Sequence, residues 1–209
     1  MKAVSLLSSG IDSPVATYIM GQQLDRILLL HAENQPYSDA KARETFIHLS
    51  HHLHKIIKKE ISAYIIAHGP TLSYILQHCD KKYTCILCKR MLLRYAETLA
   101  KKHQASMIIL GDSLGQVASQ TLQNIKVIET AATLPIIRPL IGFDKEEIIK
   151  IAREIGTYEL SIRSKGDCRA VPSVPSTQAQ ELKILQEEQQ MNISELIDQA
   201  FTTLQLVPL

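Results

Sequence analysis

The sequence predicts an α/β fold in which a five-stranded parallel sheet is covered by helices. Five apolar runs of strand length recur along the chain and alternate with helix-like segments. Residues 3–7 and 27–30 are almost continuously apolar, as expected for strands that are buried on both faces of a parallel sheet. Turns of small residues follow the first and fourth runs, at the strand ends where such sheets bind ligands.

Length and charge limit the classes of protein that remain. A chain of 209 residues can bury a full core, and we divide it into one domain over residues 1–165 and a loop with a C-terminal helical tail over 166–209 packed on it. The net charge of +2 is too balanced to indicate a nucleic-acid surface. We see no signal peptide and no apolar stretch near the roughly 20 residues that span a bilayer. We therefore expect a cytoplasmic protein with no membrane partner.

The first turn, residues 8–13, predicts an anion site; it is called the serine turn below. Its side chains are small enough for an anion to approach the backbone N–H groups, and a helix is expected from Ser13 to Gly21. Ser13 suits the N-cap and Pro14 the first helical position, so the helix would present its free N–H groups to a ligand. No lysine lies between Ala3 and Asp25, which excludes a Walker-type loop.

The second strand (27–30) ends in His31, and a helix is expected over residues 38–54. Four histidines lie on it or near its end: His48, His51, His52 and His54. Metal binding is one interpretation, but Glu44 is the only carboxylate on that face and no cysteine joins it, so a solvated helix face is favoured.

A third strand over 61–67 precedes a short helix over 71–77 and a long one that begins at the C-x-x-C pair Cys85 and Cys88. The helix dipole, Lys89 and Arg90 would all increase the acidity of these thiols and favour reactive thiolates. The alternative is a pair of small buried apolar residues. The spacing favours the reactive pair.

The fourth strand (106–110) ends in a second turn, residues 111–116, called the glycine turn below. A helix is expected from Gln116, and the two turns should face each other in one cleft. The fifth strand covers 134–140.

Asp144 and Glu147 have capping-box spacing at the start of the next helix, which Gly156 ends. A cation in a first helical turn is unfavourable to the dipole, so Lys145 has reason to reach an anion. Residues 161–177 are loop-like and contain Cys168, and 178–206 follow a helical pattern.

Several strings together resemble the ThiI family of tRNA 4-thiouridine synthetases over nearly the whole chain. They are SSGIDSPVA, HAENQPYSDAKA, CKRMLLRYAE, LGDSLGQVASQT, LPIIRPLIGFDKEEII and the late Cys168, and GDSLGQVASQT followed by RPLIGFDK is the most specific part. The resemblance implies a PP-loop fold of the adenine nucleotide alpha hydrolase type, with residues 1–165 as the ATP pyrophosphatase domain. It also implies a tRNA sulfurtransferase that adenylates a tRNA uridine and replaces its 4-oxygen with sulfur.

The resemblance also implies roles for individual residues. Ser8, Ser9, Gly10, Asp12 and Ser13 would hold pyrophosphate and Mg²⁺, and Lys145 would contact the leaving phosphates. Cys168 matches the cysteine of sulfur transfer. The positions that would line the adenosine of ATP and its phosphates are Leu6, Leu7, His31, Ala32, Lys89, Gly111 and Gln120.

The chain departs from the family pattern at four points. Ser9 replaces a usual glycine, and a positive φ there would cost about 1 kcal/mol. Lys89 replaces an arginine common in bacterial members. The sequence begins at the first PP-loop strand, so we expect neither the family's THUMP region nor a rhodanese domain. We therefore expect tRNA binding through a separate RNA-binding protein, and an external sulfur donor such as a cysteine desulfurase or sulfide.

We hypothesise that Cys85, Cys88 and Cys168 converge on the nucleotide cleft. They could hold an iron-sulfur cluster with one open iron, or run a persulfide and disulfide relay. A zinc site that also uses Cys79 is the competing interpretation.

Two other functions remain open at this stage. One is a PP-loop enzyme that thiolates or amidates a small molecule, and the other is a non-catalytic nucleotide-binding subunit. The oligomeric state is also open, with a homodimer as one option.

Overall fold

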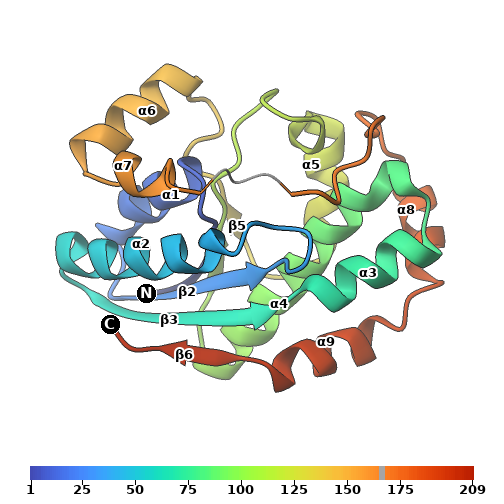
Figure 1. Ribbon diagram of the computed structural model, residues 1–209, viewed down its shortest axis with the longest axis horizontal. Coiled ribbons are helices and arrows are strands. Elements are labelled where there is room, and N and C mark those ends of the chain that lie inside the picture. The colour runs from blue at the N-terminus through green and yellow to red at the C-terminus, as the bar shows by residue number, and fades with distance from the viewer. Residues whose placement is uncertain (165–167) are drawn as a thin grey trace.

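A computed structural model of the chain describes residues 1–164 and 168–209 and has α/β architecture (Figure 1). Its central six-stranded sheet has the order β5-β4-β1-β2-β3-β6. The first five strands along the chain pair in parallel, as predicted. The strands are β1 (Lys2–Leu6), β2 (Arg26–Glu33), β3 (Glu60–Ala67), β4 (Met107–Ile109), β5 (Ile136–Ile137) and β6 (Gln205–Val207).

The sixth strand corrects the prediction of five strands and a purely helical tail. Residues of β6 pair antiparallel with Ala63, Tyr64 and Ile65 of β3. Without this pairing, that edge of β3 would leave backbone N–H and C=O groups without partners. Three residues are too few for a periodic pattern, so the helical pattern before them hid the strand.

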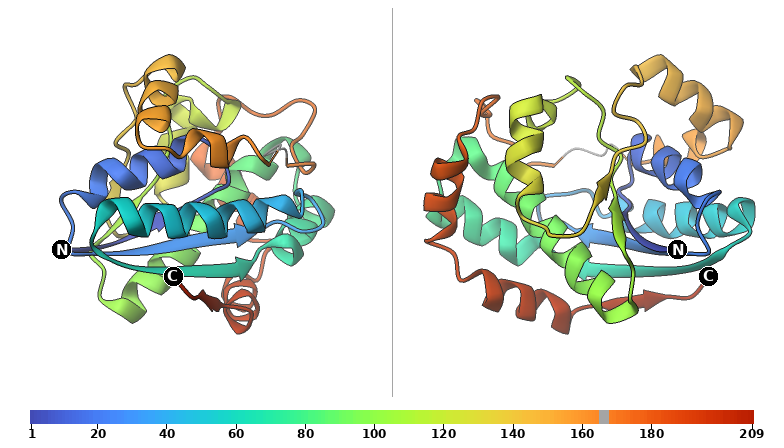
Figure 2. Two further views of the ribbon diagram at one scale, coloured as in Figure 1. Left: turned by 60° about the vertical axis from the view of Figure 1, so that its left-hand side comes forward. Right: turned by 180° about the vertical axis from the view of Figure 1, so that it is seen from behind.

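Helices cover both faces of the sheet because successive side chains of a strand point to opposite sides. Ala3, Ile27 and Leu29 pack in one buried cluster with residues of α1, α2 and α6. Val4 and Leu28 pack in the other, with residues of α3, α4, α5, α8 and α9. Figures 1 and 2 show these two layers. The bounds are α1 (Asp12–Gly21), α2 (Lys41–Ile57), α3 (Gly69–His78), α4 (Thr84–His103), α5 (Leu122–Glu129), α6 (Lys145–Glu154), α7 (Tyr158–Ser161), α8 (Glu181–Glu188) and α9 (Ile193–Thr202).

Several predicted boundaries shift for local reasons. The fifth strand shortens to two residues between Pro135 and Pro139, since proline has no N–H for the ladder. The helix expected from Gln116 is instead a short 3₁₀ turn, η2 (Ala118–Gln120), followed by α5. Helix α5 starts later because Thr121 caps it, accepting a hydrogen bond from the backbone N–H of Asn124.

The prediction for helix α6 is confirmed. Asp144 and Glu147 form the complete capping box, and Gly156, just beyond the helix, has a φ of 74°. The domain boundary predicted between 165 and 166 lies outside the described residues.

The histidines of helix α2 are exposed or half-buried. His52 contributes to packing, because its Nε2 lies 2.7 Å from the carbonyl oxygen of Ile155, just after α6. None of the helices within residues 1–164 and 168–209 is both long enough and apolar enough to cross a bilayer.

Candidate functional site

A cavity of about 330 Å³ lies where strands β1, β2 and β4 end. Its volume falls at the lower end of the range for small-molecule sites. The residues assigned to ATP from the sequence all line it: Leu6, Leu7, Ser8, Ser9, Gly10, Asp12, Ser13, His31, Ala32, Lys89, Gly111 and Gln120. Cys168 lines it too, whereas Lys145, Cys85 and Cys88 are not among its lining residues. The structure therefore brings the positions assigned to ATP and Cys168 to one cavity, and the roles of all these residues stay predictions.

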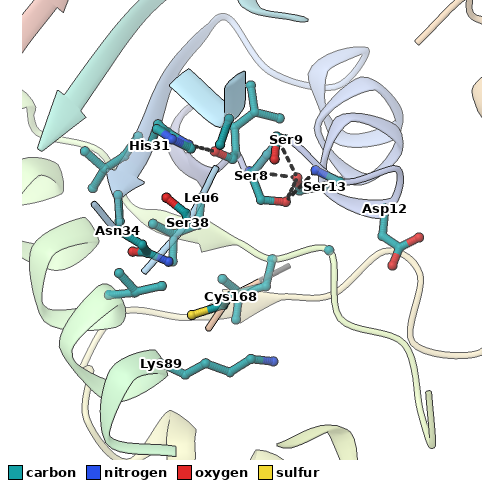
Figure 3. A pocket seen from close by; sticks show the side chains of 18 of the residues that line it. Leu6, Ser8, Ser9, Asp12, Ser13, His31, Asn34, Ser38, Lys89 and Cys168 are labelled. Carbon is teal, nitrogen blue, oxygen red and sulfur yellow. Dashed lines mark hydrogen bonds between the residues drawn. The ribbon is translucent and has the colours of Figure 1, made fainter. Parts of the chain in front are cut away.

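The serine turn is held together by its own side chains (Figure 3). The Ser13 Oγ accepts a hydrogen bond from the backbone N–H of Ser8 at 2.9 Å and lies 2.9 Å from the Ser8 Oγ. The Ser8 Oγ also accepts from the backbone N–H of Gly10 at 3.2 Å. The N-cap prediction for Ser13 is wrong, because α1 already begins at Asp12 and Ile11 is the cap residue. Ser13 instead closes the turn from within the first helical turn.

Ser9 fits the turn without backbone strain. Among the described residues, Lys58 and Gln104 are the non-glycine positions with positive φ, and Ser9 is not one of them. Its side chain is buried and its Oγ lies 3.4 Å from the Ser164 Oγ. The replacement of the family's glycine is therefore tolerated by this backbone.

The glycine turn packs directly on the serine turn, which confirms that the two share one cleft. A Cβ at Gly111 would lie 2.7 Å from both the backbone N and the Cα of Ser13. Real Cβ atoms do not approach backbone this closely, so only glycine lets the two turns meet.

Lys145 reaches an anion, as its place in a first helical turn predicted. Its Nζ lies 2.5 Å from Oδ1 of Asp12, so the pair joins the first turns of α6 and α1. The Asp12 side chain lines the cavity, and that of Lys145 is 45% exposed. The pair therefore marks the edge of the cavity next to the serine turn.

A buried carboxylate that the sequence analysis did not single out, that of Asp112, also lines the cavity. Asp112 Oδ1 is 2.7 Å from Lys89 Nζ and accepts from Gln120 Nε2 at 3.3 Å, while Oδ2 lies 3.5 Å from Arg138 Nε. Burial disfavours the ionised carboxylate, but Lys89, the Gln120 amide and Arg138 outweigh it and lower the pKa of Asp112. Its position in the GDSLGQ string was the available signal, but its partners come from three other parts of the chain.

The cavity also contains two acceptors with no hydrogen-bond partner among the described residues. Asn34 Oδ1 and Gln120 Oε1 are buried and bond to no group within residues 1–164 and 168–209. Buried acceptors are normally satisfied, so these two favour a ligand that carries N–H groups, as a nucleobase does. Together with the predicted anion site of the serine turn, they give the cavity groups of the kinds that bind the base and phosphates of a nucleotide.

His31 fixes the strand ends beside this site. Its ring stacks on Phe46 with centroids 4.8 Å apart, and Nδ1 lies 3.0 Å from the carbonyl oxygen of Leu7. Burial lowers the pKa of His31, so the ring is neutral at pH 7 and its Nδ1–H donates to Leu7. The bond ties the end of β2 to the segment that enters the serine turn.

The prediction of acidic thiols at the start of α4 is wrong. Burial is the largest effect on Cys85 and Cys88 and raises the pKa of both, more than Lys89 can lower it. The Arg90 guanidinium is paired with the Glu188 carboxylate instead, with its Nε 2.8 Å from Oε1 of Glu188. Cys168 lies close enough that its charge would raise the pKa of Cys85 and Cys88 further.

The cysteines do not assemble a metal site in the described part of the chain. All four are free thiols, and no three cysteine, histidine or acidic side chains among residues 1–164 and 168–209 lie together as a ligand set. Cys88 Sγ contacts His68 Nε2 at 3.3 Å, and Cys79 Sγ faces the carbonyl oxygen of Glu187 at 3.9 Å. Cys79 thus has a separate contact, whereas Cys168 lies near both Cys85 and Cys88, and the iron-sulfur cluster on those three thiols stays a prediction.

The chain matches known proteins along most of its length. The family profile described as thiamine biosynthesis protein (ThiI) matches residues 1–193. The probable tRNA sulfurtransferase of Methanosarcina mazei is 41% identical over 209 residues, which cover 100% of this chain and 52% of that protein. Its namesake from Methanobrevibacter smithii is 41% identical over 204 residues, covering 97% and 54%. The chain thus spans about half the length of the curated relatives it matches.

Solved structures agree with this match. A crystal structure of a 4-thiouridine synthetase–RNA complex with bound ATP superimposes with a TM-score of 0.93 at 34% identity, covering 99% of this chain and 55% of that one. NMN synthetase from Francisella tularensis shares the fold, with a TM-score of 0.56 at 14% identity, and covers 99% of this chain and 88% of its own.

Proposed function

This chain belongs to the ThiI family, and we propose that it is the part of a tRNA sulfurtransferase that uses ATP to convert a tRNA uridine into 4-thiouridine. One observation carries the proposal: the serine turn and the Cys168 thiol line the same cavity. A phosphate site and a sulfur nucleophile are the two parts that an ATP-dependent thiolation requires. Relatives named tRNA sulfurtransferases and a 4-thiouridine synthetase solved with RNA and ATP support it.

In the first step, the serine turn and Lys145 would hold the β- and γ-phosphates of ATP, and the cavity wall of Leu7, His31 and Ala32 the adenosine. The uracil 4-oxygen attacks the α-phosphorus, and pyrophosphate leaves. A carbonyl oxygen is a poor leaving group until it carries AMP, which explains why the reaction needs ATP. The Asp12 carboxylate would hold Mg²⁺, which supplies positive charge next to the phosphates.

In the second step, sulfur attacks carbon 4 of the uracil ring and AMP leaves with the original oxygen. We propose that Cys168 carries this sulfur as a persulfide supplied by a donor outside these residues, such as a cysteine desulfurase. Transfer of the terminal sulfur breaks the S–S bond when a second thiol attacks Cys168 and forms a disulfide, and Cys85 or Cys88 is the nearby candidate. An external thiol reductant then resets the pair. With sulfide as the donor, the same attack on carbon 4 needs no disulfide.

We propose that part of the tRNA-binding surface lies outside residues 1–209, for example on a separate RNA-binding protein. The net charge of +2 leaves little electrostatic attraction for a polyanion. The cavity would then receive a uridine that is already positioned.

The test is pyrophosphate release from ATP, measured with and without bulk tRNA, together with 4-thiouridine analysis of the tRNA. Stimulation by tRNA with thiolated product supports the proposal. Turnover without tRNA but with a small acceptor would indicate a small-molecule enzyme, and ATP binding without turnover a nucleotide-binding subunit. Both results would overturn it.

The substitution Cys168→Ala separates the two steps. We expect it to keep tRNA-stimulated pyrophosphate release and to abolish thiolation, because the first step uses no sulfur. Thiolation at the wild-type rate would exclude Cys168 as the sulfur carrier. Cys79→Ala is the matched control, since this buried thiol lies at the end of α3 and does not line the cavity.

A further inference from the structure

The side chain of Asn124, in the first turn of α5, bridges two segments of the site. One is η2, which carries Gln120 into the cavity. The other is the segment that follows Cys168, residues 168–179, called the cysteine segment here. In Figure 1 this segment passes beside α5. The two segments are separated in the sequence by α5, β5, α6 and α7, and the Asn124 side chain holds them side by side.

Every polar group of the Asn124 amide is used in the bridge. Its Nδ2 donates to the carbonyl oxygen of Ala118 at 2.7 Å and to that of Ser176 at 2.8 Å. Its Oδ1 accepts from the backbone N–H of Ala179 at 2.9 Å. Asn124 is fully buried, and an amide shielded from water holds its partners in one geometry.

Two neighbours extend the same contact. Thr121 Oγ1 donates to the carbonyl oxygen of Thr177 at 2.7 Å, and Gln123 Nε2 donates to that of Ala179 at 3.2 Å. Side chains at the start of α5 thus form hydrogen bonds with the backbone of residues 176–179. These bonds depend little on which side chains the gripped residues carry.

The other end of the cysteine segment is held elsewhere. The backbone N–H of Arg169 donates to the carbonyl oxygen of Tyr37 at 2.7 Å. Cys168 therefore lies directly before the attachment to the loop after β2, and the attachment at α5 holds the same segment further along the chain. Loss of the second attachment would leave the path of the segment, and the direction of the Cys168 thiol, less restricted.

We propose that Asn124 is a positioning residue that couples the nucleotide site to the cysteine segment, and so sets the Cys168 thiol against the base that ATP has activated. The proposal rests on the proposed function. Asn124 lies outside the set of residues that line the cavity, so it acts through Gln120 on one side and the cysteine segment on the other. Adenylation should depend on it weakly and sulfur transfer strongly.

The experiment uses Asn124→Ala with enzyme in excess over tRNA, so that each step occurs once. The rate constant of pyrophosphate release and that of 4-thiouridine formation are measured in the same reaction. We expect the ratio of thiolation rate to pyrophosphate-release rate to fall by about 10-fold or more. A displacement of a reacting group by about 1 Å can lower a rate by about 100-fold. Asn192→Ala is the matched control, because Asn192 caps α9 on an exposed surface.

A ratio equal to that of the wild type, whether both rates fall together or neither changes, would overturn the proposal. If Asn124→Ala does not fold, Gln123→Ala decides, because it removes the bond to Ala179 and leaves both the Asn124 side chain and the Thr121 cap in place. A smaller shift of the same ratio is expected there, and an unchanged ratio counts against the coupling.

Alkylation of Cys168 by iodoacetamide, followed on its peptide by mass spectrometry, tests the positioning without catalysis. We expect Cys168 to be alkylated several-fold faster in Asn124→Ala than in the wild type, and an unchanged rate would contradict the proposal. If the wild type neither releases pyrophosphate nor thiolates tRNA, the proposed function fails, while this measurement still tests the bridge.

Discussion

The serine turn and the cysteines represent two ways of building a functional site. The turn is formed by six consecutive residues whose own hydrogen bonds define its shape, such as that from the Ser8 N–H to the Ser13 Oγ. Cys85, Cys88 and Cys168 come from two segments about 80 positions apart, and their environment is set by what buries them. Local chemistry therefore predicts the first region well and the second poorly.

The largest effect is expected from removing the Asp12 carboxylate of the serine turn. Asp12→Ala removes the partner of Lys145 and the proposed Mg²⁺ ligand, so we expect tRNA-stimulated pyrophosphate release to fall at least about 100-fold. Asp198→Ala, on the exposed face of α9, is the control. Wild-type rates in Asp12→Ala would show that the turn does not act on the phosphates.

Gly111→Ala should disturb the turn without removing any polar group. The added Cβ would lie 2.7 Å from Ser13 backbone atoms, so we expect destabilisation of about 1–3 kcal/mol and weaker ATP binding. Thermal melts with and without ATP measure both effects. Gly142→Ala is the control, because a Cβ there meets nothing within 4 Å. Equal behaviour of the two variants would contradict the close packing of the two turns.

The smallest effect concerns thiol reactivity in the second region. Because burial raises the pKa of Cys85 and Cys88, both should be protonated at pH 7 and react with iodoacetamide more slowly than free cysteine. Their rates should rise as the pH is raised toward those pKa values. Alkylation rates at pH 7 above that of free cysteine would support the acidic thiols that the sequence predicts. Local sequence would then predict both regions equally well.

Much of the fold follows from patterns within short stretches. The five parallel strands, the capping box at Asp144 and the glycine beyond α6 all have local signals, and all are present. The antiparallel β6 had no such signal, since it forms only because β3 offers an edge. The fold was therefore predictable except where one segment completes another.

The site divides in the same way. Spacing indicated that the two turns share a cleft and that Lys145 reaches an anion, and both are confirmed. Asp112 and Arg138 were missed as site residues because the partners that define their roles lie elsewhere in the chain. Polar residues of this kind give no sign in a sequence of whether they point to water or to one another.

By itself, the sequence determined the parallel sheet, the turn of small residues after the first strand and the family to which the chain belongs. Backbone conformation, apolar periodicity and helix capping depend on neighbours within a few residues, so these features can be read locally. Only the tertiary structure decided the protonation of the thiols, the bridge at Asn124 and the packing of Gly111 against the serine turn. Burial and long-range hydrogen bonds control these features, and both arise only when distant segments pack together. For the serine turn, packing against Gly111 and closure by the Ser13 hydroxyl replaced the helix cap that the sequence predicted.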